Sequence, residues 1–291
     1  MYRLSDLSLS AHRDRGDVPF YNIHIPRSGG TSICNTFRAN LGDDAVPHHF
    51  VWSNCNLRHN NGFYLDGLLQ SCSEQYRLSK EANFSMIARE SPMFGHLEEG
   101  HPILCDEFEY IFSFRNIEQR IESMFRCNSM DIVNRSKGMM IGMFSESITR
   151  WFGWDQWAAN VQRKGVWLQY FECLRAEYAE IDEIHFQNAV QYLLGIDHVL
   201  IMDAHDPGGR YKAQWDRMLR RIRGKYGMER EGVFEQWSHS GSEWCNEEHS
   251  MLKGIDDEKM AMYTDWAKHN AFDHMLFELA RLIADIEIDL L

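Results

Sequence analysis

The sequence contains no run of 18 apolar residues, no Cys-x-x-Cys pair and no apolar segment near its start. The first absence predicts that no helix of the chain crosses a membrane. The polar stretch at residues 1–17 lacks the apolar centre of a secretory signal. We therefore expect no membrane segment in this chain and a flexible N-terminal segment at residues 1–17.

Cysteine is scarce and scattered, and this pattern bears on the redox environment. The seven cysteines stand singly, at positions 34, 55, 72, 105, 127, 173 and 245. The odd count leaves at least one thiol free, and no dense disulfide framework is visible. Scattered cysteines are typical of proteins from a reducing compartment, which predicts a cytoplasmic protein. A luminal Golgi domain trimmed of its anchor remains the alternative.

Positive charge is also in short supply, because 30 Lys and Arg face 43 Asp and Glu and give a net charge of −13. Such a chain is a poor match for nucleic acid unless a local patch overrides the average. One local patch exists, at residues 210–225, where seven basic residues face the single acid Asp216. We interpret it as a solvated helix with a basic face, and a site for an anionic ligand is the alternative.

The hydrophobic pattern predicts an α/β fold with a parallel sheet flanked by helices. Apolar residues make up 44% of the chain, which is sufficient for a full core. Strands alternate with helices along the chain, and no long linker or repeat interrupts them, so we expect a single domain spanning residues 1–291. Expected strands cover residues 18–25, 83–89, 110–114 and 198–203, and expected helices cover 31–40, 117–126, 184–194, 210–225 and 258–284.

The most informative motif follows the first expected strand. The residues Pro26-Arg27-Ser28-Gly29-Gly30-Thr31-Ser32 join this strand to a helix. The N–H groups of a first helical turn attract anions, and glycines let the backbone approach them closely. The sequence therefore predicts a phosphate-binding loop. It is not a Walker A loop, because the early glycine and the lysine of that motif are missing.

A second anion signal occurs in residues 110–126, YIFSFRNIEQRIESMFR. Arg115 directly follows an expected strand, and Ser123 lies about two helical turns later. Ligands of open α/β sheets bind at the carboxyl ends of the strands. Arg115 is therefore expected to bind a phosphate with two hydrogen bonds, and the Ser123 hydroxyl is expected to add a further donor.

Together these motifs resemble those of sulfotransferases that use 3′-phosphoadenosine 5′-phosphosulfate (PAPS), most closely the Golgi carbohydrate branch. The first resembles the family's 5′-phosphosulfate loop, with Arg27 in place of the usual lysine. The second resembles the R-D-P-x-x-R-x-x-S motif for the 3′-phosphate. Arg115, Arg120 and Ser123 match it, whereas Asn116 and Ile117 replace Asp and Pro. The resemblance implies the sulfotransferase fold, a P-loop-like parallel sheet.

The resemblance also implies a set of residue roles. Arg27 would neutralise charge on the leaving phosphate, and Ser28, Gly29, Gly30, Thr31 and Ser32 would hold the 5′-phosphosulfate. Arg115 and Ser123 would hold the 3′-phosphate. His96, in a Gly-His pair between the two motifs, would act as the general base. A surface histidine without a catalytic role is the alternative for His96.

The function implied is sulfuryl transfer from PAPS, with 3′,5′-adenosine diphosphate (PAP) as product, to a hydroxyl or amine of a small-molecule or carbohydrate acceptor. No metal is expected, because the histidines and cysteines near residue 96 fit no compact zinc signature. No G-x-S-x-G motif of a serine hydrolase is present. A nucleotide or small-molecule kinase and a non-catalytic nucleotide-binding protein remain alternatives. Near the end of the chain, Asn270 and Asp273 resemble a late family motif and are expected to brace neighbouring backbone.

Overall fold

The computed structural model describes the parts of the chain that form its central layers. The described residues are 18–25, 28–47, 55–56, 72–89, 97–98, 101–102, 104–120, 123, 146, 148–149, 181–202, 209–226 and 270–289. Expectations for residues 1–17, for helical residues 258–269, and for Arg27 and His96 lie outside this part of the chain.

Four parallel strands form the central sheet, in the order β2-β1-β5-β6. They are β1 (Phe20–Ile23), β2 (Met86–Arg89), β5 (Glu109–Phe114) and β6 (His198–Ile201). β1 lies between β2 and β5. The chain therefore first adds β2 on one side of β1 and then adds β5 on the other side. The order therefore reverses between β1 and β5, and all four strands end at the same edge. The expected parallel α/β sheet is confirmed.

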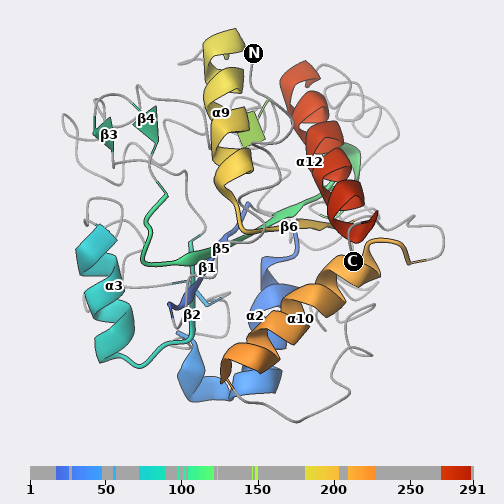
Figure 1. Ribbon diagram of the computed structural model, residues 1–291. Coiled ribbons are helices and arrows are strands. Elements are labelled where there is room, and N and C mark those ends of the chain that lie inside the picture. Colours follow the sequence, from blue (N-terminus) through green and yellow to red (C-terminus); the bar gives the residue numbers. More distant parts are fainter. Residues whose placement is uncertain are drawn as a thin grey trace, which may run out of the picture.

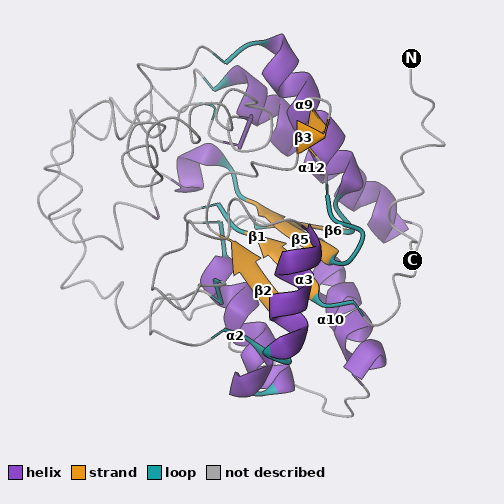
Figure 2. Cartoon of the chain, turned by 90° about the vertical axis from the view of Figure 1, so that its left-hand side faces the viewer, coloured by secondary structure: helices purple, strands orange, loops and turns teal. Residues whose placement is uncertain are grey.

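Helices cover both faces of this sheet and give three layers (Figure 1, Figure 2). On one face lie α2 (Gly30–Leu41), followed by the short 3-10 turn η2 (Asp43–Ala45), and α10 (Lys212–Tyr226). On the other lie α9 (Glu183–Gly195) and α12 (Ala271–Asp289). Alternate residues of β1 supply both cores: Phe20 packs beneath α2, and Tyr21 and Ile23 face the other layer. Apolar residues on both faces are typical of a buried parallel strand.

One helix and two short strands were not predicted. The helix α3 (Cys72–Glu81) falls in a region interpreted as mixed and turn-rich, and its Tyr76 packs against the core on the α9 side. Residues 90–101 were interpreted as a loop, but the short strands β3 (Leu97–Glu98) and β4 (His101–Pro102) pair antiparallel there. His96 directly precedes β3 in the sequence.

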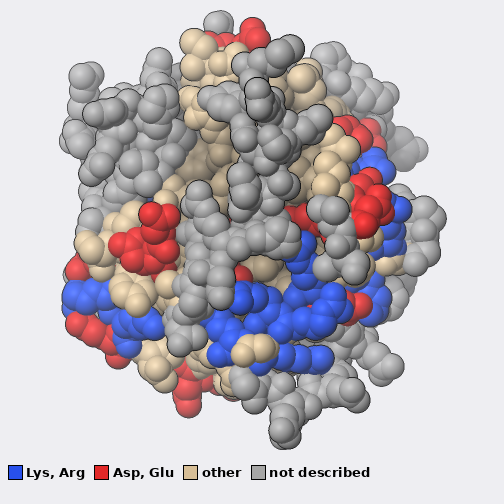
Figure 3. Space-filling model, in the orientation of Figure 1, with Lys and Arg blue, Asp and Glu red and all other residues tan. Residues whose placement is uncertain are grey.

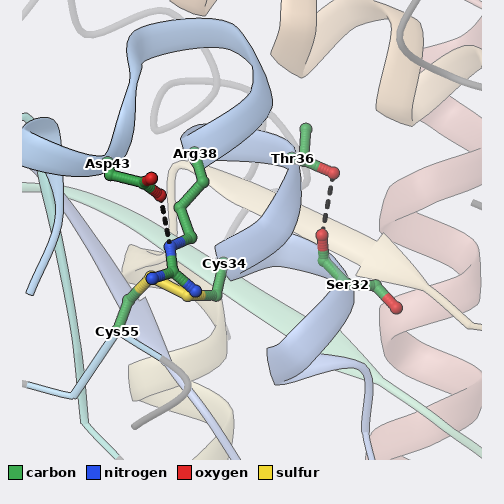
Figure 4. The surroundings of a disulfide bond; sticks show 6 residues. All are labelled: Ser32, Cys34, Thr36, Arg38, Asp43 and Cys55. Atoms are coloured by element: carbon green, nitrogen blue, oxygen red, sulfur yellow. Dashed lines mark hydrogen bonds and ion pairs between the residues drawn. A yellow bond between two sulfur atoms is a disulfide. The ribbon is translucent and has the colours of Figure 1, made fainter. Parts of the chain in front are cut away.

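Among the described residues, two disulfides join cysteines whose pairing the sequence left open. Cys34 on α2 is bonded to Cys55, and Cys72 at the start of α3 is bonded to Cys105. Figure 4 shows the first of them beside the ion pair of Arg38 with Asp43. Disulfides persist in oxidising compartments, so the cysteine pattern no longer supports a reducing compartment. The sequence pattern does not reveal these pairs, because the two cysteines of each disulfide lie 21 and 33 residues apart in the chain.

The start of α12 is braced as expected. Asn270 accepts a hydrogen bond from the backbone N–H of Glu146, whose carboxylate accepts from the N–H groups of Phe272 and Asp273. The Asp273 carboxylate accepts from the N–H groups of Ile148 and Thr149 at 2.9 and 2.8 Å. Glu146 thus satisfies N–H groups at the start of the helix that have no partner within it. Asn270 and Asp273 therefore have the bracing role predicted for them.

Among the described residues, no helix is both long enough and apolar enough to cross a membrane.

Candidate anion-binding site

The phosphate loop predicted from the sequence leads from the carboxyl end of β1 into α2. Its backbone carbonyls are engaged by the protein: Ile25 accepts from the N–H of Ser28 at 3.1 Å, and Gly29 accepts from the N–H of Ile33 at 3.0 Å. The Ser28 carbonyl accepts from the buried hydroxyl of Ser113 on β5. No described residue accepts a hydrogen bond from the N–H of Gly29 or Gly30. These N–H groups at a helix start are suited to an anion.

Both glycines of the loop are required by its geometry. Gly29 has a φ of +91°, in the left-handed region, and a Cβ built on it would lie 2.5 Å from the Cε atom of Met202. A Cβ on Gly30 would overlap the buried imidazole ring of His24. The loop thus packs closely on His24 and Met202, the residues at and just beyond the ends of β1 and β6. Any side chain at either position forces the neighbouring ring or thioether to move.

The second motif lies beside this loop, because β1 and β5 are neighbours in the sheet. Arg115, half-buried, comes directly after β5, and residues 117–120 are helical. Asn116 accepts from the backbone N–H of Glu118 at 2.8 Å, and its carbonyl accepts from the N–H of Arg120. Asn116 thus caps this helical turn, and Ile117 is its first residue.

Arg120 contributes a second positive charge near Arg115. Its side chain is fully buried, and Asp273 of α12 is close enough to interact with it. Burial lowers the pKa of Arg120 to about 10; Asp273 opposes this shift and Arg115 adds to it. The guanidinium still carries its charge at neutral pH. The charges of Arg115 and Asp273 therefore both act on the buried guanidinium of Arg120, in the turn that follows β5.

A third arginine at this edge was not singled out from the sequence. Arg89 is the last residue of β2, and its carbonyl accepts from the N–H of His24 at 2.9 Å. Its charge also acts on Tyr192 of α9: burial raises the pKa of that hydroxyl, and Arg89 opposes the shift. The rule that ligands bind at strand ends could have drawn attention to an arginine that closes an apolar strand.

The structure brings together most of the predicted site residues that it describes. Residues 28–32 and Arg115 lie at the carboxyl ends of neighbouring strands, with Thr31 exposed and Ser32 half-buried on the first turn of α2. Ser123 is helical and half-buried, in the turns that follow Arg115. Arg27 and His96 lie outside the described residues, so their roles stay predictions.

The basic segment at residues 210–225 forms α10, as expected, and Lys and Arg side chains gather over it in Figure 3. Several of these basic side chains form ion pairs with acidic residues of the protein. Arg217 pairs with Glu287 at 3.5 Å, and Arg221 and Lys225 both pair with the buried Glu109. Much of the basic face is therefore used within the molecule, which favours the interpretation as a structural surface helix.

The described residues contain one group with metal-ligand atoms close together: Cys72, Cys105 and Glu107. The two sulfur atoms are joined in a disulfide, so they are not thiolates available to a metal. This group is therefore a disulfide with a neighbouring carboxylate and not a metal centre.

Comparison of the chain with protein-family profiles, with characterised proteins and with solved structures found no match.

Proposed function

We propose that this chain is a PAPS-dependent sulfotransferase with the sulfotransferase fold. In the proposed reaction it transfers the sulfuryl group from PAPS to a hydroxyl or amine of a small-molecule or carbohydrate acceptor. The S–O bond to the 5′-phosphate breaks, a bond from sulfur to the acceptor forms, and the acceptor proton passes to a base, for which the motif points to His96. PAP, with its 3′- and 5′-phosphates, is the other product.

The observation that carries the proposal is the position of the two motifs at one point of the sheet. The strand order reverses between β1 and β5, and the crevice at such a reversal is where open α/β sheets bind ligands. The glycine loop follows β1, and Arg115 follows β5. A nucleotide with two separate phosphate groups matches two anion-binding elements side by side. The proposed reaction develops charge on transferred and leaving oxygens, which fixed N–H groups and guanidinium groups stabilise.

The roles proposed for individual residues follow from their chemistry. The N–H groups of residues 29–32 and the hydroxyls of Thr31 and Ser32 would bind the 5′-phosphosulfate. Arg115, with Ser123, would bind the 3′-phosphate. Arg27 cannot lose its proton near neutral pH, so it would act as an electrostatic clamp and not as a general acid. Fixed cations and a helix N-terminus would thus take the part that metal ions have in many phosphoryl transferases.

A thermal-shift titration with PAP tests this proposal, with ADP and ATP–Mg²⁺ as comparison ligands. A ligand that binds only the folded state raises the midpoint of unfolding. We expect PAP to raise it and ADP and ATP to have little effect, because only PAP carries a 3′-phosphate. The Arg115→Ala variant should lose most of the PAP shift, whereas Arg77→Ala, an exposed arginine on α3, should keep it. Stabilisation by ATP alone, or by none of the three, would contradict the proposal.

A further inference from the structure

A row of three side chains from adjacent strands underlies the glycine loop. His24 follows β1, Ser113 lies within β5, and Met202 follows β6. His24 contacts Gly30, Met202 contacts Gly29, and the Ser113 hydroxyl donates to the carbonyl of Ser28. Of these three contacts, only that of Ser113 is a directional hydrogen bond, and both of its partners are 1% exposed.

This hydrogen bond fixes the orientation of one peptide unit. The carbonyl of Ser28 and the N–H of Gly29 belong to the same planar trans peptide, so they point in opposite directions. With the carbonyl held toward β5 by Ser113, the N–H of Gly29 points away from that strand. No side chain at Gly29 resists rotation of this peptide, because glycine adopts φ values of either sign readily. The orientation therefore depends on a partner outside the loop.

We propose that Ser113 is a positioning residue for the anion-binding loop: its hydroxyl holds the Ser28–Gly29 peptide with the N–H directed at the bound anion. This inference rests on the proposed function, because the anion is taken to be the 5′-phosphate end of PAPS or PAP. Ser113 itself does not touch the ligand. It acts through the Ser28 carbonyl, and its loss leaves a buried carbonyl without its hydrogen bond and the peptide free to turn.

The strand β5 provides a matched control for this test. Tyr110, near its start, accepts a hydrogen bond through its hydroxyl from the N–H of Cys105 at 2.9 Å, and this bond is buried too. Ser113→Ala and Tyr110→Phe each remove one buried hydroxyl from the same strand and leave one backbone group without its partner. We expect both to lower the unfolding midpoint, whereas only the first affects the anion loop. Ser113→Thr, which keeps the hydroxyl, serves as the rescue variant.

Calorimetric titration with PAP and two-dimensional amide NMR give the decisive readouts. We expect Ser113→Ala to weaken PAP binding roughly tenfold or more, and Tyr110→Phe to stay within about twofold of the wild type. Without ligand, the amide of Ile33, which donates to Gly29, should exchange faster in Ser113→Ala alone. Wild-type affinity in Ser113→Ala, or an equal loss of affinity in both variants, would overturn the inference while leaving the proposed function intact.

Failure of the proposed function gives a different result. A wild-type protein that does not bind PAP contradicts the sulfotransferase proposal. Titration with inorganic sulfate then tests the positioning role of Ser113 independently of PAP. The measurement is the change in chemical shift of the Gly29 and Gly30 amides. Shifts in the wild type that disappear in Ser113→Ala support the positioning role, and shifts that are equal in both proteins, or absent from both, overturn it.

Discussion

The imidazole ring of His24 lies directly against Gly30, in the space that any side chain at residue 30 would need. Both residues are buried, at the point where β1 gives way to α2. The ring therefore fixes how closely the first turn of α2 approaches the sheet. This contact also explains why a glycine is needed at a position whose φ is not in the left-handed region.

We expect Gly30→Ala to lower the free energy of unfolding by about 1–3 kcal/mol, because the added methyl group overpacks a buried site. His24→Ala opens that space, so the double variant should recover part of the loss. Urea unfolding of the three variants measures the coupling. Gly42→Ala is the control: Gly42 has a φ of +94° but nothing within 4 Å of a built Cβ, so it reports backbone strain alone. Simple additivity of the two site variants would contradict the contact.

Acid should destabilise the protein through Glu109. Burial by itself raises the pKa of this carboxyl, but the hydrogen bond and charge of His198, with Lys225 and Arg221, outweigh it and lower the pKa from 4.5 to about 2. Because the folded-state pKa lies below the unfolded value, the stabilisation is fully present above pH 4.5 and is lost as the pH falls toward 2. A shift of this size corresponds to about 3 kcal/mol.

Urea unfolding of the wild type and of Glu109→Gln at several pH values measures this effect. At neutral pH the variant should be less stable by roughly 3–5 kcal/mol, because it leaves buried cations without their carboxylate. The difference between the two proteins should narrow as the pH falls below 4.5. Glu118→Gln, at an exposed position, should follow the wild type throughout. A difference that does not vary with pH would show that Glu109 acts through packing alone.

Asp273 should contribute strongly to stability. It accepts three hydrogen bonds from residues 148–149, and it is the carboxylate that interacts with the buried guanidinium of Arg120. We expect Asp273→Asn to cost about 3 kcal/mol, as for other buried charges deprived of a partner. Asp285→Asn removes a carboxylate from the same helix, where Asp285 pairs with Arg210 at the surface, and should change little. Equal effects of the two substitutions in urea unfolding would refute this role.

The two disulfides should be detectable and should differ in their influence on the site. Peptide mass spectrometry without reduction should recover Cys34 linked to Cys55 and Cys72 linked to Cys105. Replacing either pair by serine should lower stability by about 3–4 kcal/mol, given loops of these lengths. Only the Cys34–Cys55 disulfide is attached to α2. Replacing this pair should therefore also weaken PAP binding, whereas replacing the Cys72–Cys105 pair should not. Free thiols at all four of these cysteines in protein isolated without reductant would contradict this pairing.

Much of the fold was predictable because its strands are apolar and its turns carry clear signals. The run from Val18 to Ile25 predicts β1, and the glycines and hydroxyls after it predict the start of α2. The helix α3 was missed because its sequence is polar. Arg77 pairs there with Glu74 and Glu81 on the helix surface, a pattern of i,i+3 and i,i+4 charges that could have revealed it.

The candidate site was predictable only as separate pieces. Residues 28–32 and Arg115 carry local signals, because a glycine turn and a strand end can be recognised from a few neighbours. Ser113 and Met202 carry no such signal, since each matters only through which strand lies beside which. That order is a property of the whole sheet, and short segments do not encode it.

The strand order also determines when in folding the site can exist. β1 pairs with β2, some 66 residues later in the chain, and with β5, some 89 residues later, so both halves of the anion site depend on distant contacts. A nascent chain therefore displays the glycine loop long before Arg115 has been synthesised, and longer still before β6 brings Met202 beneath Gly29. We therefore expect the chain to bind PAP only after the sheet is complete. PAP binding could then be used to follow the last steps of folding.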